Sequence, residues 1–242
     1  MLFRSHVAFH VASFHKSRSC RNDTYYTIYV NLCQAIAAGP ILKENHLCYN
    51  WSMKRNDEDL YKAIEKTLQE SAVAVLAIDG PSGSGKSTLA GLLQERFGAR
   101  VIPMDDFFLP RELRTPDRYA QPGENIHHER FLEEVGPYLG AGGLEKPLTY
   151  RPFDCKAMDY GPVRVAPWAP LTVVEGSYSL HAALRHLYGI SVFLTVESGE
   201  QERRILSREG PEGLQVFQSR WIPLENSYFE ALHPERFCDF IL

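Results

Sequence analysis

Several features that would assign a protein to a broad class are scarce or absent in this sequence of 242 residues. Its five cysteines are an odd number and widely spaced, and they form neither a Cys-x-x-Cys pair nor a Cys/His spacing typical of zinc sites. This usage favours a reducing compartment, so we expect a cytoplasmic protein. No apolar run approaches the roughly 18 to 20 residues that a membrane-spanning helix needs, and we therefore expect no membrane partner.

An excess of positive charge is also lacking. Lysine and arginine number 26 against 30 aspartates and glutamates, which gives a net charge of −4. Proteins that bind nucleic acid usually present a strongly basic surface, so the charge predicts no nucleic-acid partner. The length suits one α/β domain with a large core and leaves little room for a second.

The first 52 residues show no helical or strand period. We expect them to be an N-terminal extension, either disordered or upstream sequence with Met53 as the real start. An organelle transit peptide is the alternative, because the first 22 residues contain four basic residues and no acid precedes Asp23. The folded domain is expected to span residues 53–242.

From Asn56 onward, apolar runs alternate with helical stretches. Leu60, Ile64 and Leu68 share one face of a helix that ends before Ser71. Further helices are expected at residues 89–97 and 130–138, and strands at 72–78, 101–104, 171–174, 190–196 and 238–242. This alternation predicts an α/β fold with a five-stranded parallel sheet sandwiched by helices. The many prolines and glycines of residues 140–170 predict an irregular, hairpin-like insertion.

One motif carries a specific chemistry. Residues 80–87 read G-P-S-G-S-G-K-S, which fits the phosphate-binding loop G-x-x-x-x-G-K-[ST], and they lie between a buried strand and an amphipathic helix as this loop requires. The glycines let backbone N–H groups turn toward phosphate oxygens, and the helix adds its positive end. We expect ATP to be bound by Gly80, Pro81, Ser82, Gly83, Ser84, Gly85, Lys86, Ser87 and Thr88. Lys86 would bridge the β- and γ-phosphates, and the Ser87 hydroxyl would bind Mg²⁺.

The class of P-loop protein follows partly by exclusion. The sequence contains neither the N-K-x-D that reads guanine in GTPases nor the L-S-G-G-Q signature of ABC ATPases. Motors and AAA-type machines need additional elements for which 242 residues leave little room. A kinase of a small molecule remains.

Three further segments resemble the uridine kinase and nicotinamide riboside kinase group: A-I-D-G at 77–80, P-M-D-D-F-F at 103–108 and V-V-E-G-S-Y at 173–178. With the phosphate loop they extend the resemblance over residues 72–242. It implies a P-loop fold with a lid helix, and transfer of the γ-phosphate of Mg·ATP to a hydroxyl of a nucleoside or similar metabolite. A kinase of a non-nucleoside such as pantothenate or a sugar phosphate is one alternative, and a non-catalytic ATP-binding regulator is another.

The resemblance also assigns roles near the phosphates. Asp105 would be the catalytic base, with capping as its structural alternative, and Asp106 is a second candidate for metal binding or capping. Glu175, at the end of an expected strand, would hold Mg²⁺ through water. Arg204 and Arg208 are four residues apart and resemble lid arginines that neutralise the transferring phosphoryl group, although pairing with nearby glutamates would also explain them.

The acceptor side is less well defined by the sequence. Relatives usually carry an acid where this chain has His127 and His128, so the resemblance does not single out uridine, although His127 can still hydrogen-bond a hydroxyl. Tyr150 could stack on a base or pack in the core, and Arg151 could instead bind an anionic acceptor. Tyr178 could line the acceptor pocket or belong to a turn.

Overall fold

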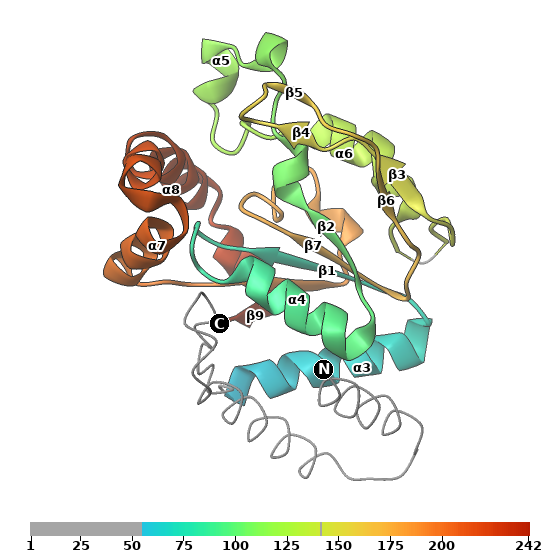
Figure 1. Ribbon diagram of the computed structural model, residues 1–242. Coiled ribbons are helices and arrows are strands. Elements are labelled where there is room, and N and C mark those ends of the chain that lie inside the picture. Colours follow the sequence, from blue (N-terminus) through green and yellow to red (C-terminus); the bar gives the residue numbers. More distant parts are fainter. Residues whose placement is uncertain (1–54, 141) are drawn as a thin grey trace, which may run out of the picture. The chain divides into compact units, whose positions relative to one another are not determined.

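The fold is known from a computed structural model, which describes residues 55–140 and 142–242 (Figure 1). These residues belong to one compact unit, Met53–Leu242. The expected N-terminal extension, with its transit-peptide alternative, lies outside the described residues. Within the described ranges, no helix is both long and apolar enough to cross a membrane.

A parallel sheet of five strands forms the centre of the domain. The order in space is β2-β7-β1-β8-β9, and every neighbouring pair is parallel. The strands are β1 (Ala74–Asp79), β2 (Arg100–Pro103), β7 (Leu171–Glu175), β8 (Ile190–Phe193) and β9 (Phe240–Ile241). All residues of β1 and β7 are buried, as expected for central strands that are covered on both faces. The predicted five-stranded parallel sheet is therefore confirmed, although most strands begin or end a few residues from their expected positions.

Helices cover the two faces of the sheet. On one face, α4 (Lys86–Phe97) lies beside α3 (Arg55–Ser71), with Tyr61 and Phe97 in ring contact at 6.0 Å (Figure 1). On the other face, α6 (His128–Glu134) contributes Phe131 to a buried apolar cluster. The helix expected at residues 130–138 is shorter because Gly136 and Pro137 end it, and a 3-10 turn, η3 (Gly136–Tyr138), follows.

Residues 198–232 form a helical arm. It consists of α7 (Ser198–Val216), the π-helical turn η5 (Phe217–Trp221) and α8 (Ile222–Leu232), at the left of Figure 1. A kink interrupts α7 where Gly210 has φ 72° and Pro211 follows. The short helices elsewhere are η1 (Met104–Phe107), η2 (Arg111–Leu113), α5 (Pro116–Tyr119), η4 (Arg185–Leu187) and η6 (Pro234–Phe237).

The insertion at residues 140–170 is more regular than expected, because it contains two antiparallel ribbons. β3 (Leu148–Tyr150) pairs with β6 (Arg164–Ala166), and β4 (Phe153–Asp154) pairs with β5 (Asp159–Tyr160). The hairpin-like character of this region is thus confirmed.

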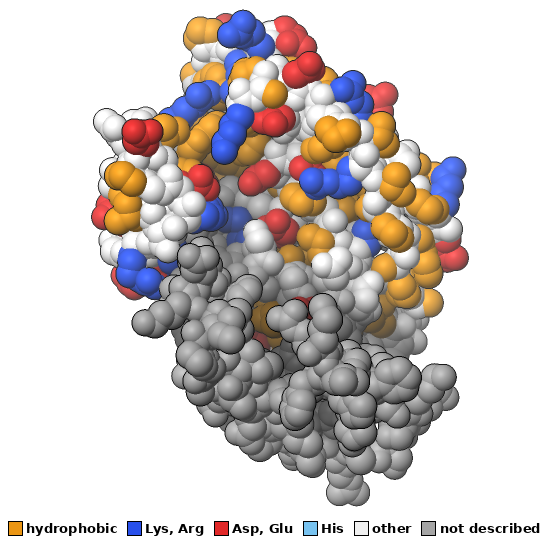
Figure 2. Space-filling model, viewed as in Figure 1, with side chains coloured by type: hydrophobic (Ala, Val, Ile, Leu, Met, Phe, Trp, Pro, Cys, Tyr) orange, Lys and Arg blue, Asp and Glu red, His pale blue; other side chains and the backbone are white. Residues whose placement is uncertain are grey.

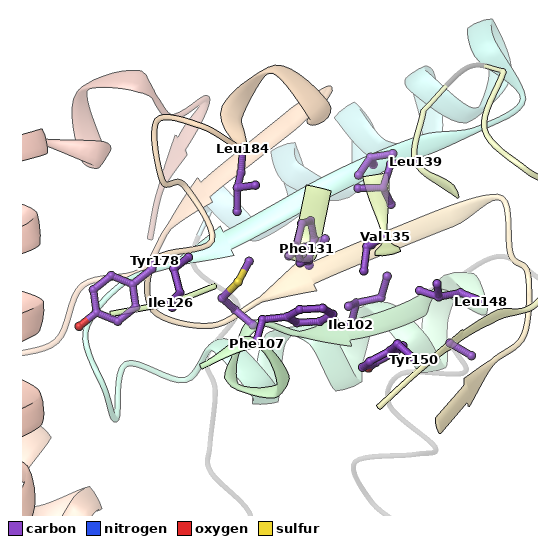
Figure 3. Packing of buried hydrophobic residues seen from close by; sticks show 14 of the residues in the cluster. Ile102, Phe107, Ile126, Phe131, Val135, Leu139, Leu148, Tyr150, Tyr178 and Leu184 are labelled. Carbon is purple, nitrogen blue, oxygen red and sulfur yellow. The ribbon is translucent and has the colours of Figure 1, made fainter. Parts of the chain in front are cut away.

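A buried apolar cluster attaches the turn η1 to the insertion (Figure 3). Phe107 of η1 lies 5.0 Å from Phe131 and 5.2 Å from Tyr150 between ring centroids, and Phe107, Phe131, Ile102 and Val174 are fully buried. Burial of an apolar side chain of this size contributes about 1.5–3 kcal/mol. The cluster therefore fixes the turn that follows β2, and this turn carries Asp105.

Candidate active site

The phosphate-loop motif connects β1 to α4 at the carboxyl ends of the strands. Gly80 has φ 136°, and a Cβ there would collide with the carbonyl oxygen of Leu194. Only glycine fits this position, since it lacks a Cβ and tolerates positive φ. Gly83 (φ 77°) and Gly85 (φ 102°) are also in conformations that favour glycine. The backbone thus has the tight, glycine-dependent course that the motif predicts.

Lys86, the first residue of α4, directs its ammonium group back over this loop. It donates to the carbonyl oxygens of Gly80 (2.8 Å) and Pro81 (2.9 Å) and to the Ser177 hydroxyl (3.3 Å). The residue is buried, at 8% exposure. A positive charge is therefore held at the concave side of the loop, where it can meet an anion.

Ser87 and Glu175 lie side by side at the ends of α4 and β7. The Ser87 hydroxyl donates to Glu175 Oε2 at 3.1 Å. Burial raises the pKa of Glu175, and the negative charge of Asp105 raises it further. A hydroxyl and a carboxylate of this kind are oxygen ligands that suit Mg²⁺, and a cation would relieve the repulsion between the two acids. These residues fit the magnesium ion that the sequence predicts.

Asp105 lies in η1, just beyond β2. Solvent reaches its side chain, although protein surrounds it on the other sides. The surrounding protein limits hydration of the Asp105 carboxylate and so raises its pKa, and the negative charges of Glu225 and Asp106 raise it further. The positive charge of Lys86 opposes this rise. A carboxylate with a raised pKa is a stronger base than an ordinary one. Asp105 thus lies within electrostatic reach of Lys86 and Arg208.

The two predicted arginines of α7 are brought to the same region. Arg204 donates to the carbonyl oxygen of Gly83 (2.9 Å) and to Glu200 (2.6 Å), so it contacts the phosphate loop. Arg208 donates to Glu209 (2.9 Å), and its positive charge lowers the pKa of Asp105. Both arginines also have glutamate partners, which is the arrangement that the structural alternative predicts.

Glu225 of α8 is a site residue for which the sequence suggested no role. It is 4% exposed, and it accepts hydrogen bonds from Ser82 N (2.9 Å), the Ser82 hydroxyl (2.6 Å) and the Ser177 hydroxyl (2.8 Å). Buried carboxylates are costly unless they are satisfied in this way. Glu225 is therefore a positioning residue that fixes the backbone of the phosphate loop.

Asp79 is a second residue without a predicted role. It is fully buried, and it accepts hydrogen bonds from the backbone N–H groups of Gly80 (2.6 Å), Tyr178 (3.1 Å) and Leu180 (2.8 Å) and from the Tyr228 hydroxyl (2.9 Å). Burial raises its pKa to about 6. An acid at the end of an otherwise apolar strand was the available sequence signal. Asp79 ties the start of the phosphate loop to the segment that follows β7.

Two predicted acceptor-side tyrosines are not brought to an exposed surface. Tyr150 is 4% exposed, and its hydroxyl donates to Asp106 Oδ2 at 2.7 Å. Tyr178 is 2% exposed and packs against Tyr228 at 4.9 Å between ring centroids. Both belong to the apolar cluster labelled in Figure 3. Because both side chains are buried, little of either ring is available to a ligand. Tyr150 therefore has the packing role that the sequence left open for it.

Asp106, the second candidate for metal binding or capping, contacts the insertion. Its carboxylate accepts hydrogen bonds from Tyr150 and from Arg164, with which it also forms an ion pair. Arg130 donates to its backbone oxygen at 2.6 Å. Asp106 therefore connects η1 to the ribbon β3–β6.

The other two acceptor-side candidates lie on different parts of the domain. The backbone N–H of His127 donates to Phe107 O (2.6 Å), and burial lowers the pKa of its half-buried imidazole. Arg151 donates to the carbonyl oxygens of Gly161 (2.8 Å) and Tyr160 (2.7 Å), and it lines a cavity of about 580 Å³ beside Thr149 and Glu134. Arg151 is thus hydrogen-bonded within the insertion, and it makes no hydrogen bond to the phosphate-loop residues.

Glu124, His128 and His181 form a cluster whose ligand atoms lie within 4.8 Å of one another. Such a set could hold a metal ion, but two contacts favour a hydrogen-bonded cluster instead. Arg118 is already paired with Glu124 at 3.2 Å. The backbone N–H of Ala183 donates to His181 Nδ1 at 3.3 Å, so neutral His181 carries its proton on Nε2, which faces Glu124 at 3.5 Å.

This cluster predicts an acid-sensitive stability. Burial lowers the pKa of His181 to about 4, and the charge of His128 contributes in the same direction. Because the unfolded chain binds this proton near pH 6.5, the stabilising contribution is complete above that pH and is lost as the pH falls toward 4. The loss at pH 4 is expected to reach up to about 3 kcal/mol. Urea unfolding of the wild type and of His181→Gln between pH 7.5 and 4 measures it.

The matched control for that experiment is His186→Gln, because His186 is exposed on the same segment. We expect the pH slope of the free energy of unfolding to be shallower in His181→Gln and unchanged in His186→Gln. Equal slopes in all three proteins would contradict the assignment.

Comparison with known proteins identifies the fold. No protein-family model matches the chain, and no curated protein sequence matches it. Among solved structures, a possible uridine kinase from Bacillus stearothermophilus is 19% identical with a TM-score of 0.54, and the match covers 76% of this chain and 99% of that one. A proposed fructose transport system kinase from Silicibacter sp. TM1040 is 23% identical, with a TM-score of 0.51 and coverage of 74% and 97%.

A third similar structure is YFH7 from Saccharomyces cerevisiae, described as a proposed P-loop containing kinase with a circular permutation. It is 14% identical with a TM-score of 0.51, and the match covers 72% of this chain and 94% of that one. At these identities the similarity establishes architecture. The chain has the P-loop kinase fold that its sequence predicts.

Proposed function

We propose that this chain is an ATP-dependent kinase that transfers the γ-phosphate to a hydroxyl group of a small metabolite. One observation carries the proposal: Asp105 lies within electrostatic reach of Lys86 and of Glu175, which bonds to Ser87. Lys86, Ser87 and Glu175 serve the phosphates, whereas a protein that only bound ATP would have no need of a base on the acceptor side.

The chemistry follows from these positions. Asp105 accepts the proton of the acceptor hydroxyl while the oxygen of that hydroxyl attacks the γ-phosphorus. The bond from that phosphorus to the β–γ bridging oxygen breaks, and ADP is released. Lys86 holds negative charge at the loop, and Arg204 and Arg208 stabilise the transferring group from α7. When bound, Mg²⁺ would neutralise charge on the phosphate oxygens, with Ser87 and Glu175 as the residues that hold it.

A nucleoside of the uridine or cytidine type, or a similar metabolite, is the first candidate for the acceptor. The resemblance of residues 72–242 to nucleoside kinases supports a nucleoside, as does the fold shared with a possible uridine kinase. A non-nucleoside acceptor is the second candidate, and the fold shared with a proposed fructose transport system kinase favours it.

The test is acceptor-dependent ADP formation by the purified protein with Mg·ATP. Uridine, cytidine, nicotinamide riboside, pantothenate and several sugar phosphates form the panel, and removal of Mg²⁺ with EDTA provides the blank. Turnover that depends on one acceptor and on Mg²⁺ is expected. Tight ATP binding without stimulation by any acceptor would instead favour a regulatory, non-catalytic protein.

A further inference from the structure

Two arginines are anchored on the residues that directly follow the turn carrying Asp105. Arg114 donates through Nε to the carbonyl oxygen of Leu109 at 2.7 Å. The Arg220 guanidinium stacks over Trp221 at 4.6 Å, and Trp221 packs on Phe108 at 5.5 Å between ring centroids. Both arginines are therefore attached to the two residues that directly follow η1, Arg114 from the loop after β2 and Arg220, through Trp221, from the helical arm.

Cys155 contacts Arg114 and is within electrostatic reach of Arg220 and Asp105. Arg114 Nη2 lies 3.5 Å from the Cys155 sulfur, and the guanidinium also stacks over Phe153 at 5.5 Å. Burial raises the pKa of Cys155; the charge of Asp105 raises it further, whereas those of Arg114 and Arg220 lower it. The charges of Arg114, Arg220 and Asp105 therefore all reach this one side chain.

Neither arginine is neutralised within the protein. Across residues 55–140 and 142–242, no carboxylate lies within ion-pair distance of Arg114 or Arg220. Several arginines around this region do have acidic partners, namely Arg118, Arg164, Arg204 and Arg208, whereas Arg151 bonds to carbonyl oxygens. Figure 2 shows both basic and acidic side chains around a hollow between the α7–α8 side and the β3–β6 side. Two uncompensated guanidinium groups beside a candidate acceptor site favour an anionic ligand.

We propose that the metabolite accepting the phosphoryl group already carries a phosphate, bound by Arg114 and Arg220 while its hydroxyl faces Asp105. Two guanidinium groups match the dianionic charge of a phosphate monoester, and the fork of donors on each suits its oxygens. A neutral nucleoside would leave both positive charges without a partner. This inference rests on the proposed kinase activity and specifies its substrate class.

The kinetic test compares acceptors that differ only in the anion. Ribose with ribose 5-phosphate, fructose with fructose 6-phosphate, and panthenol with pantothenate are assayed for ADP formation by the wild type, Arg114→Gln, Arg220→Gln and the exposed control Arg236→Gln. We expect a preferred phosphorylated acceptor. Loss of one charged hydrogen-bonding partner should raise its KM by about 10- to 100-fold, since such a bond contributes roughly 1.5–3 kcal/mol. Arg236→Gln should match the wild type.

A binding test separates this inference from the kinase proposal. With the phosphate loop saturated by a non-hydrolysable ATP analogue, calorimetric titration with inorganic phosphate should show a site that weakens at least tenfold in Arg220→Gln. The Arg220 side chain makes no hydrogen bond to the protein in the described part of the chain, so this variant should fold normally. Asp105→Asn should strengthen the site because it removes a nearby negative charge.

The outcomes are distinct. Turnover of neutral acceptors that Arg220→Gln leaves unchanged would overturn the inference and leave the kinase proposal intact. Preference for pantothenate over all phosphorylated acceptors would overturn the phosphate assignment in favour of a carboxylate. Phosphate binding that depends on Arg220, without turnover of any acceptor, would support the anion site and count against the kinase proposal.

Discussion

Replacement of Asp105 by asparagine is expected to lower kcat for acceptor-dependent ATP turnover by about 10²- to 10⁴-fold, the usual contribution of a positioned general base. Asparagine keeps the size of the side chain and cannot accept the proton of the attacking hydroxyl. Because the carboxylate lies beyond β2 and not in the phosphate loop, the affinity for ATP should change little. Steady-state kinetics with calorimetric measurement of ATP binding separates the two quantities.

The pH dependence provides a second readout for Asp105. The base acts when it is deprotonated, and its pKa is raised by burial and by the neighbouring acids. Activity should therefore fall, as the pH is lowered, at a higher pH than an ordinary aspartate would give. Asp59→Asn, which changes an exposed acid on α3, is the matched control. Full activity in Asp105→Asn would remove this residue from the mechanism.

Replacement of Lys86 by methionine is expected to reduce kcat by about 10²- to 10³-fold. This is the usual loss when one preorganised group that stabilises charge in the transition state is removed. Methionine has a similar length and fits the buried position, but it offers no positive charge to the phosphates. Single-turnover measurement of phosphoryl transfer at saturating ATP tests the effect on the chemical step.

Lys66→Met is the control for Lys86, since Lys66 is exposed on α3 and pairs only with Glu70 at 3.9 Å in the described residues. We expect wild-type turnover from it. Turnover in Lys86→Met within a factor of two of the wild type would contradict the phosphate-binding role of the motif.

Much of the fold could be predicted because local patterns determine it. Buried strands of a parallel sheet read as short apolar runs, and the phosphate-loop motif marks the junction of one strand with its helix. Element ends were less predictable. Met104 belongs to the 3-10 turn η1 and not to β2, and α4 begins at Lys86 instead of residue 89. The position of the motif residues at the strand ends could be predicted from the sequence, whereas their catalytic roles stay predictions.

The residues that support the loop could not be found from sequence, because their partners are distant along the chain. Glu225 bonds to Ser82 across a separation of 143 residues, and Tyr228 reaches Asp79 across 149. A single sequence contains no signal for such pairs. Tyr150 and Tyr178 present a related problem, since nothing in an aromatic residue near a motif tells whether its ring faces a ligand or the core.

The dependence of the phosphate loop on the helical arm also has a consequence for biosynthesis. Ser82 is held by Glu225 of α8, and Gln201 of α7 donates to its carbonyl oxygen at 2.9 Å. During translation, the ribosome adds these partners more than a hundred residues after the loop itself. A nascent chain that already contains the whole motif therefore lacks the contacts that shape it. Nucleotide affinity should arise late, when most of the chain has emerged and the arm has docked.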